Sequence, residues 1–363
     1  MSAEKKKMTR TKSQQTRRTF LKGAGVVMTA ALADQFLLAK EAQAQNKQVL
    51  MNTWGGVLTE AENEAFYKPF TKATGIPVKP VTPVSYAKWK AQVTSGQYEW
   101  DITTLNQAQW GRAEQEGLVE PIDWTIIDKS KLWDGAVYAN GIGFTTLSNN
   151  LCYRKDKFPN GGPKNWADFW DVKKFPGNRS FNAGDAITSV LAALQADGVA
   201  KDKLYPPDLD RAFKKLDELK PHIKVFWTQG TQSQQLLRDG EVDMMMIWNA
   251  RATDLQKQGV PVELVWEGNM MLITNIGVAK GAPDIKASWE YIKQSIQPER
   301  LADYAQRLPY GPANPEAFKF IPENVAKDLP TYPANLAVGV RIDPAWGVNY
   351  AKLEERYAQW MAS

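Results

Sequence analysis

Strand-like and helix-like stretches alternate between residues 49 and 116, and this alternation limits the fold more than any other feature of the sequence. Three short runs have the apolar character of strands, and each is followed by a stretch whose apolar residues recur at helical spacing. Strands joined through helices pair in parallel, because the helix carries the chain back to the starting edge of the sheet. The pattern predicts an α/β fold with a parallel sheet covered by helices. Strands are expected at 49–52, 78–81 and 100–105, and helices at 58–73, 86–93 and 108–116.

A second alternation of the same kind occupies the middle of the chain, and together they exceed a single hydrophobic core of roughly 200 residues. Two lobes are therefore expected. Residues 140–153 are apolar and rich in hydroxyl groups without a helical period, which predicts a long strand that crosses between the lobes. Residues 308–344 are proline-rich and are expected to be irregular. Further strands are expected at 180–182, 225–228, 242–247, 262–266 and 270–279, and further helices at 164–170, 186–196, 209–219, 231–239, 252–258, 283–296, 299–307 and 349–361.

The strand expected at 242–247 ends in an unusual group of side chains. Trp248, Asn249 and Arg251 supply a large aromatic ring, an amide and a guanidinium just where the next helix begins. Ligands of open α/β sheets bind beyond the carboxyl ends of the strands. We therefore expect this strand to end in a ligand-binding cleft.

Residues 1–44 have the pattern of a cleaved export signal. A basic segment with Arg17 and Arg18 precedes an apolar run at 23–39 and an Ala-Gln-Ala cleavage signal at 42–44. The paired arginines are typical of twin-arginine export. A membrane anchor is disfavoured because the apolar run is short and interrupted by Asp34. The mature protein is predicted to lie in the bacterial periplasm and not to be an integral membrane protein.

Charge and rare residues exclude several functions. Residues 1–44 hold nine of the 45 basic and three of the 40 acidic residues, so the remainder carries 36 basic and 37 acidic residues and a net charge of −1. This balance gives no reason to expect nucleic-acid binding. Cys152 is the single cysteine and is expected to be buried, so no disulfide can form within the chain. His222 is the single histidine and is expected in an exposed loop, which disfavours histidine-rich metal sites and Ser-His or Cys-His catalysis. No cofactor is expected.

Several short motifs occur in a fixed order along the chain and together resemble one known family; they occupy 71–78, 116–118, 122–123, 166–170, 240–242, 246–249, 259–262, 265–266 and 310–315. The mature chain resembles extracellular solute-binding proteins of ABC importers, in the spermidine/putrescine-binding branch. The resemblance implies a two-lobed periplasmic binding protein type II fold, in which hinge closure encloses a ligand in the interlobe cleft. It also implies an inner-membrane ABC permease as partner, and we expect a monomer. The lobes are expected at 46–145 with 270–320, and at 146–269 with 321–363.

The resemblance also implies cleft residues, some of which depart from the family pattern. Trp248 and Asp185 match the family's aromatic and acidic positions, and Trp54 lies near its early tryptophan. Thr188 and Thr274 stand where the family has carboxylates, and Asn106 stands near a hydroxyl-bearing pair. Polyamines need several carboxylates, since each desolvated ammonium must be paired. A long polycation is therefore a doubtful ligand.

The hypothesis is a small ligand with one ammonium group and one acid group, such as an amino-acid-like compound or short amine. Asp185 would hold the cation, Arg251 would hold the anion, and aromatic rings and polar side chains would complete the site. The alternative roles are those of a helix cap for Asp185 and a surface residue for Arg251. Stacking is expected from Trp54, Trp227 and Trp248, and hydrogen bonds from Asn106, Thr188, Thr274 and Tyr310.

Other functions stay open at this point. The chain could bind a carboxylate or phosphonate anion, or capture a ligand for a chemoreceptor. An iron(III)-binding relative would need paired tyrosines, and no adjacent Tyr-Tyr occurs after residue 44. A periplasmic enzyme is the least favoured alternative, because no Gly-x-Ser-x-Gly motif is present.

Overall fold

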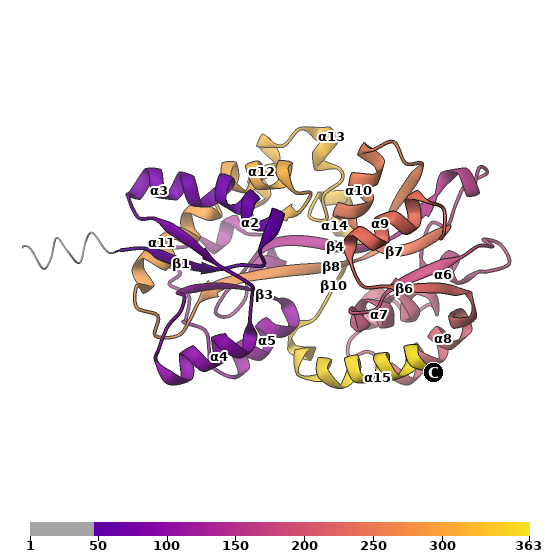
Figure 1. The fold of residues 1–363 in the computed structure, drawn as a ribbon, viewed down its shortest axis with the longest axis horizontal. Helices are drawn as coiled ribbons and strands as arrows, with labels where there is room; N and C mark the ends of the chain where they lie inside the picture. Colours follow the sequence, from indigo (N-terminus) through magenta and orange to yellow (C-terminus); the bar gives the residue numbers. More distant parts are fainter. Residues whose placement is uncertain (1–46) are drawn as a thin grey trace, which may run out of the picture. The chain divides into compact units, whose positions relative to one another are not determined.

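A ten-stranded sheet runs through residues 49–363 of the computed structural model, which describes residues 47–363 (Figure 1). The strand order is β2-β1-β3-β8-β4-β7-β5-β6, with two short strands paired beside β4 and β8. The strands are β1 (Val49–Asn52), β2 (Val78–Val81), β3 (Ile102–Asn106), β4 (Ile142–Arg154), β5 (Arg179–Asn182), β6 (Ile223–Trp227), β7 (Met244–Trp248), β8 (Val262–Val278), β9 (Gly311–Pro312) and β10 (Val340–Arg341).

The pairing confirms both alternating patterns. β1 pairs in parallel with β2 and β3, and β5 pairs in parallel with β6 and β7. The long strand expected at 140–153 is β4, which pairs antiparallel with β8 along its length. β3 joins one end of β8 and β7 joins the opposite end of β4, so these two strands connect the parallel groups (Figure 1).

One prediction about the strands was wrong. The two strands expected at 262–266 and 270–279 form a single strand, β8. The register moves from Leu151 opposite Val265 to Asn149 opposite Met270, so the residues between Val265 and Met270 bulge out of the ladder. Gly268 lies in this bulge with φ of 68°, a conformation that side chains with a Cβ rarely adopt. Gly268 interrupts the run of strand-like residues in the sequence, which is why two strands were predicted, but in the structure the strand continues past it.

The helices follow their expected positions closely, with two differences. The helix expected at 58–73 is interrupted by a π-helical turn at Asn63–Tyr67. The segment 308–344, expected to be irregular, contains the short elements β9, β10, α13 and α14. The α-helices are α2 (Gly56–Glu62), α3 (Lys68–Thr74), α4 (Tyr86–Ser95), α5 (Gln107–Gln115), α6 (Trp166–Trp170), α7 (Ala186–Ala196), α8 (Leu209–Leu219), α9 (Gly230–Arg238), α10 (Asn249–Lys257), α11 (Ile285–Ser295), α12 (Pro298–Arg307), α13 (Glu323–Ala326), α14 (Pro333–Val338) and α15 (Tyr350–Ala362).

Separate hydrophobic cores lie at the two ends of β4 and β8. The first core joins β1 and β3 to α3, α11 and α12, and the second joins β5 to α7, α8 and α15. A third core packs α9 and α10 on the other face of β7. Alternate residues of β7 serve different cores, because Met244 and Met246 enter the second core while Met245 and Ile247 enter the third. The predicted strand at 242–247 is thus buried on both faces. The exact lobe boundaries stay a prediction.

The predicted export signal, residues 1–44, lies outside the described residues. Among residues 47–363, no helix combines the length and the apolar character that crossing a membrane requires.

Candidate ligand-binding cleft

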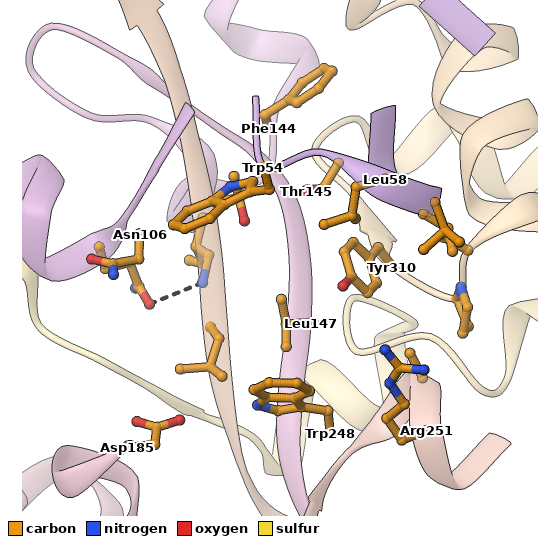
Figure 2. Close-up of a pocket in the computed structure, with 18 of the residues that line it drawn as sticks. Trp54, Leu58, Asn106, Phe144, Thr145, Leu147, Asp185, Trp248, Arg251 and Tyr310 are labelled. Carbon is orange, nitrogen blue, oxygen red and sulfur yellow. Dashed lines mark hydrogen bonds between the residues drawn. The ribbon is translucent and has the colours of Figure 1, made fainter. Parts of the chain in front are cut away.

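A cavity of about 1570 Å³ lies between side chains from both ends of the crossing strands (Figure 2). Ligand pockets usually measure about 300–1,000 Å³. The cavity is thus wider than a small solute needs, as expected of a cleft that closes around its ligand. Seven of the nine predicted site residues line it: Trp54, Asn106, Asp185, Trp248, Arg251, Thr274 and Tyr310.

Trp248 forms the aromatic wall of the cavity and is supported from behind by Trp227. The two rings meet edge to face, with centroids 5.0 Å apart and planes at 90°. Trp227 is fully buried, and its indole Nε1 donates to the backbone oxygen of Met246 at 2.9 Å. Trp227 was predicted to stack on the ligand. The structure instead places it beneath Trp248, because its position at the end of β6 turns it into the core.

Asp185 precedes α7 and is held in place by Asn149 of β4. The Asn149 Nδ2 donates to Asp185 Oδ2 at 2.6 Å and to Thr188 Oγ1 at 3.0 Å. Asp185 occupies the N-cap position of α7, but its side chain makes no capping hydrogen bond. The carboxylate is held mainly by Asn149, and the backbone amide of Thr188 adds a weaker interaction that lowers its pKa. Burial raises the pKa of Asp185 to about 6, with hydrogen bonds from Thr188 and Asn149 opposing the shift.

Thr188 lies one turn into α7, below the cavity rather than on its wall. It is fully buried, and its hydroxyl donates to the backbone oxygen of Asp185 at 3.0 Å. The Thr188 hydroxyl is therefore not exposed to the cavity in this conformation and cannot make the predicted hydrogen bond to a ligand. The residue supports the Asp185 segment instead.

Arg251 reaches the cavity from the first turn of α10. Its Nη1 donates to Gln234 Oε1 at 3.3 Å, and its side chain passes over Gly230 of α9. A Cβ at position 230 would lie 2.6 Å from Arg251 Nε, so the glycine leaves room for the guanidinium. Figure 2 shows Arg251 and Asp185 on opposite sides of Trp248. We call the positions of Arg251 and Asp185 the basic end and the acidic end of the cavity, and an aromatic surface lies between them.

The opposite wall comes from the loops that follow β1 and β3. Trp54 is 39% exposed, which leaves its ring available to a ligand. Asn106 caps α5 by accepting from Gln109 N at 2.9 Å, and it pairs in register with Thr274 of β8. Trp54 and Asn106 therefore face Trp248 across the cavity (Figure 2).

Asn249 fixes the strand end to the segment that carries Tyr310. This buried amide accepts from Ser148 N at 3.0 Å and donates to the backbone oxygen of Pro309 at 2.7 Å. Because Trp248 precedes Asn249 and Tyr310 follows Pro309, one side chain sets the relative positions of two cavity residues.

The comparisons with known proteins identify the family. A sequence profile of bacterial extracellular solute-binding proteins matches residues 65–334. The chain belongs to this family. The result confirms the predicted resemblance, and the solved relatives below confirm the two-lobed α/β fold.

Two relatives within the family are named for different ligands. A gamma-aminobutyric acid (GABA)-binding protein of Pseudomonas aeruginosa is 33% identical over 335 residues, which cover 89% of this chain and 94% of that protein. A spermidine/putrescine-binding periplasmic protein of Salmonella typhimurium is 24% identical over 289 residues, covering 76% of this chain and 81% of that protein.

Two solved structures align over most of this solute-binding protein. The structure of an ABC transporter substrate-binding protein from Bradyrhizobium japonicum has a TM-score of 0.81 at 37% identity, covering 87% of this chain and all of that one. The Atu4243 GABA receptor has a TM-score of 0.82 at 35% identity, covering 87% of this chain and 98% of that one. The relatives are solute-binding proteins rather than enzymes.

Glu62 is a cavity residue of this solute-binding protein that the sequence analysis did not select. It ends α2, lines the cavity and is 4% exposed. A signal was present, because Glu62 lies three and four residues before Ala65 and Phe66 and so shares their apolar helix face. A carboxylate within an apolar stripe indicates a buried charge with a specific role.

The single cysteine and the single histidine do not line the cavity. Cys152 is fully buried, and burial raises the pKa of its thiol well above the usual range. His222 is exposed at the end of a short 3₁₀-helix. Within residues 47–363, no cluster of three histidine, cysteine or acidic side chains could hold a metal ion.

Proposed function

We propose that this protein is the periplasmic receptor of an ABC importer for an ω-amino acid such as GABA. The observation that carries the proposal is the placement of Asp185 and Arg251 on opposite sides of Trp248 in one cavity (Figure 2). An ω-amino acid has an ammonium at one end, a carboxylate at the other and an apolar chain between them. These three parts correspond to Asp185, Arg251 and Trp248.

Electrostatics favours a ligand with both charges over one with a single charge. Closure of the cleft removes water from the ligand, and a desolvated charge needs a partner of opposite sign. The guanidinium of Arg251 can bind a carboxylate through two parallel hydrogen bonds. Burial raises the pKa of Asp185 to about 6, so its ionised form is less stable than that of an exposed carboxylate, and a bound ammonium would stabilise it. The names of the GABA-binding relatives support this choice of ligand.

Polyamine capture is the second candidate, and Glu354 favours it. This glutamate of α15 lines the cavity, and its charge contributes to the raised pKa of Asp185 after burial and the local hydrogen bonds. Two acidic groups near one end of the cavity could hold a dication. Arg251 at the other end opposes the second ammonium of a polyamine, because a polyamine brings no carboxylate to neutralise the guanidinium.

The proposal also covers how the protein is exported, where it acts and how its lobes move. Export through the twin-arginine pathway would place the mature protein in the periplasm, as a monomer that delivers its ligand to an inner-membrane permease. The lobes at 46–145 with 270–320 and at 146–269 with 321–363 would close over the cleft around β4 and β8. The names of the ABC-transporter and periplasmic relatives support this role.

A thermal-shift screen tests the function. The purified mature protein is melted with GABA, 5-aminovalerate, putrescine, spermidine, butyrate and an alkyl phosphonate. A ligand present at a hundred times its dissociation constant stabilises the folded protein by about 2.7 kcal/mol, and this raises the melting temperature measurably. We expect the ω-amino acids to raise the melting temperature most. Stabilisation by putrescine or spermidine alone would contradict the proposal and favour the second candidate.

A further inference from the structure

Glu62 presents one carboxylate oxygen to the wall of the ligand cavity. Its Oε2 accepts two hydrogen bonds, from Thr53 Oγ1 and from the Tyr67 hydroxyl, both at 2.6 Å. Its Oε1 has no hydrogen-bond partner among residues 47–363, and it is not among the buried atoms that are cut off from solvent. Since Glu62 lines the cavity, we infer that Oε1 is the oxygen that meets its contents.

The surroundings of Glu62 are aromatic hydroxyls rather than cations. Tyr67 follows on the same helical segment, while Tyr291 of α11, Tyr304 of α12 and Tyr310 lie near enough for the Glu62 charge to raise their pKa values further, after the larger effect of burial. No basic side chain contributes to the pKa of Glu62, which burial raises to about 7 against the hydrogen bonds from Thr53 and Tyr67. The two groups that hold the carboxylate are neutral hydroxyls, and none of the salt bridges within residues 47–363 includes Glu62.

Tyr310 lines the cavity together with Glu62 and with Arg251, the residue of the basic end. Burial raises the pKa of Tyr310, the Arg251 charge opposes this rise, and the Glu62 charge adds to it. Figure 2 shows Arg251 beside Tyr310. On the Glu62 side, the Tyr310 ring packs against Tyr304 with centroids 6.2 Å apart, and Tyr304 stacks on Phe66, one helical turn after Glu62. A ligand whose carboxylate binds Arg251 would have its adjacent carbon near Tyr310 and Glu62.

We propose that Glu62 binds a second amino group of the ligand, next to the carboxylate held by Arg251, so that the site accepts an α,ω-diamino acid. This inference rests on the proposed function and narrows its ligand class. The protein would supply two carboxylates, Asp185 and Glu62, and one guanidinium, Arg251. A diamino acid supplies two ammonium groups and one carboxylate, which match these charges in number and sign.

A simple ω-amino acid matches the site less completely. It would leave Glu62 buried without a partner, and an unpaired buried charge is costly. The other charged groups that line the cavity do not remove this imbalance, because most are exposed and several are paired with neighbours. Examples are Glu64 with Lys68, Arg112 with Glu116, and Arg307 with Asp303.

The test uses two ligands that differ by one amino group. Calorimetric titration at about pH 7.5, where Glu62 is mostly ionised, compares GABA with 2,4-diaminobutyrate. We expect the wild-type protein to bind 2,4-diaminobutyrate at least about tenfold more tightly, as a charge-assisted hydrogen bond provides. In Glu62→Gln we expect this preference to disappear, while the affinity for GABA changes less than about threefold.

Controls separate a binding role from a structural one. The amide oxygen of Glu62→Gln can still accept from Thr53 and Tyr67, so circular dichroism melting should show a folded protein. Glu64→Gln removes a carboxylate from the outer part of the same cavity and should keep the preference. Tight GABA binding with no gain from the second amino group would overturn this inference alone. Failure of both compounds to bind would overturn the proposed function together with it.

Discussion

At the scale of single residues, the cavity owes its selectivity to charged groups that are partly withdrawn from water. Asp185 is positioned by Asn149, Arg251 by Gln234, and Glu62 by two hydroxyls. Each of these side chains is fixed before a ligand arrives, which lowers the entropy that binding must remove. The charges of the site therefore act from set positions.

The Asp185→Asn variant tests the acidic end. Loss of the carboxylate should weaken binding of an ω-amino acid by about 2 kcal/mol, or roughly thirtyfold in Kd, because the ligand ammonium loses its counter-charge. The ligand-free protein should melt at the same or a higher temperature, since burial of this carboxylate is unfavourable. Calorimetric titration and thermal melting measure the two effects. Glu60→Gln, which alters an exposed lining residue, is the control and should bind normally.

The pH dependence of binding tests the same residue. Because burial raises the pKa of Asp185 to about 6 in the free protein, the carboxylate is ionised above this pH and protonated below it. A cationic ligand binds the ionised form. The affinity for GABA, which has no second amino group for Glu62, should therefore be nearly constant from about pH 8 to 7 and fall up to about tenfold per unit below about pH 6. A wild-type Kd that stays flat down to about pH 4.5 would show that Asp185 does not hold the ammonium, and Asp185→Asn should show little of this dependence.

At the scale of elements, the site collects loops that follow strands of both groups. Trp54 follows β1, Asn106 ends β3, Asp185 lies between β5 and α7, and Trp248 ends β7. Ligand sites form at such strand ends because backbone and side-chain groups converge there. Helix α9 contributes Gly230, which has no side chain and therefore leaves space for the side chain of Arg251.

The Gly230→Ala variant tests this contact between α9 and α10. The added methyl would lie 2.6 Å from Arg251 Nε and should push the guanidinium from its place. We expect affinity for ligands with a carboxylate to fall about tenfold, with little loss of stability because alanine favours helix more than glycine. Gly184→Ala is the matched control, as its Cβ would make only an ordinary contact of 3.7 Å. Equal affinity in both variants would contradict the role given to Gly230.

The sequence predicted elements better than it predicted which side chains reach the cavity. The strand end at Trp248 and the start of α7 were predictable because apolar runs and helical spacing mark them directly. Trp227 and Thr188 were misplaced because the facing direction of a side chain depends on strand register and helix rotation, which tertiary packing sets. Glu62 was missed because its partners, Thr53 and Tyr67, belong to a neighbouring loop and a π-helical turn that no local pattern reveals.

At the scale of the folded unit, residues 49–363, the two ends of the cleft are joined by the crossing strands, by the packing of α5 against residues 344–349 and by single hydrogen bonds. β4 and β8 run between them, and Gln107 of α5 adds a third link by donating to Ile342 O at 3.0 Å and accepting from Ile273 N at 3.0 Å. Asn249 adds a fourth through Pro309. Separate cores joined by few strands can move as bodies about a hinge. The wide cavity is consistent with the open form of such a protein.

A single cleft, once closed, should recognise both ends of one small ligand. Calorimetric titration of the wild-type protein with GABA, butylamine and butyrate tests this recognition most directly, because the last two compounds each carry one of the charges. We predict that GABA binds at least about a hundredfold more tightly than either, since Asp185 and Arg251 both contribute. Binding of butylamine or butyrate as tight as that of GABA would contradict the account.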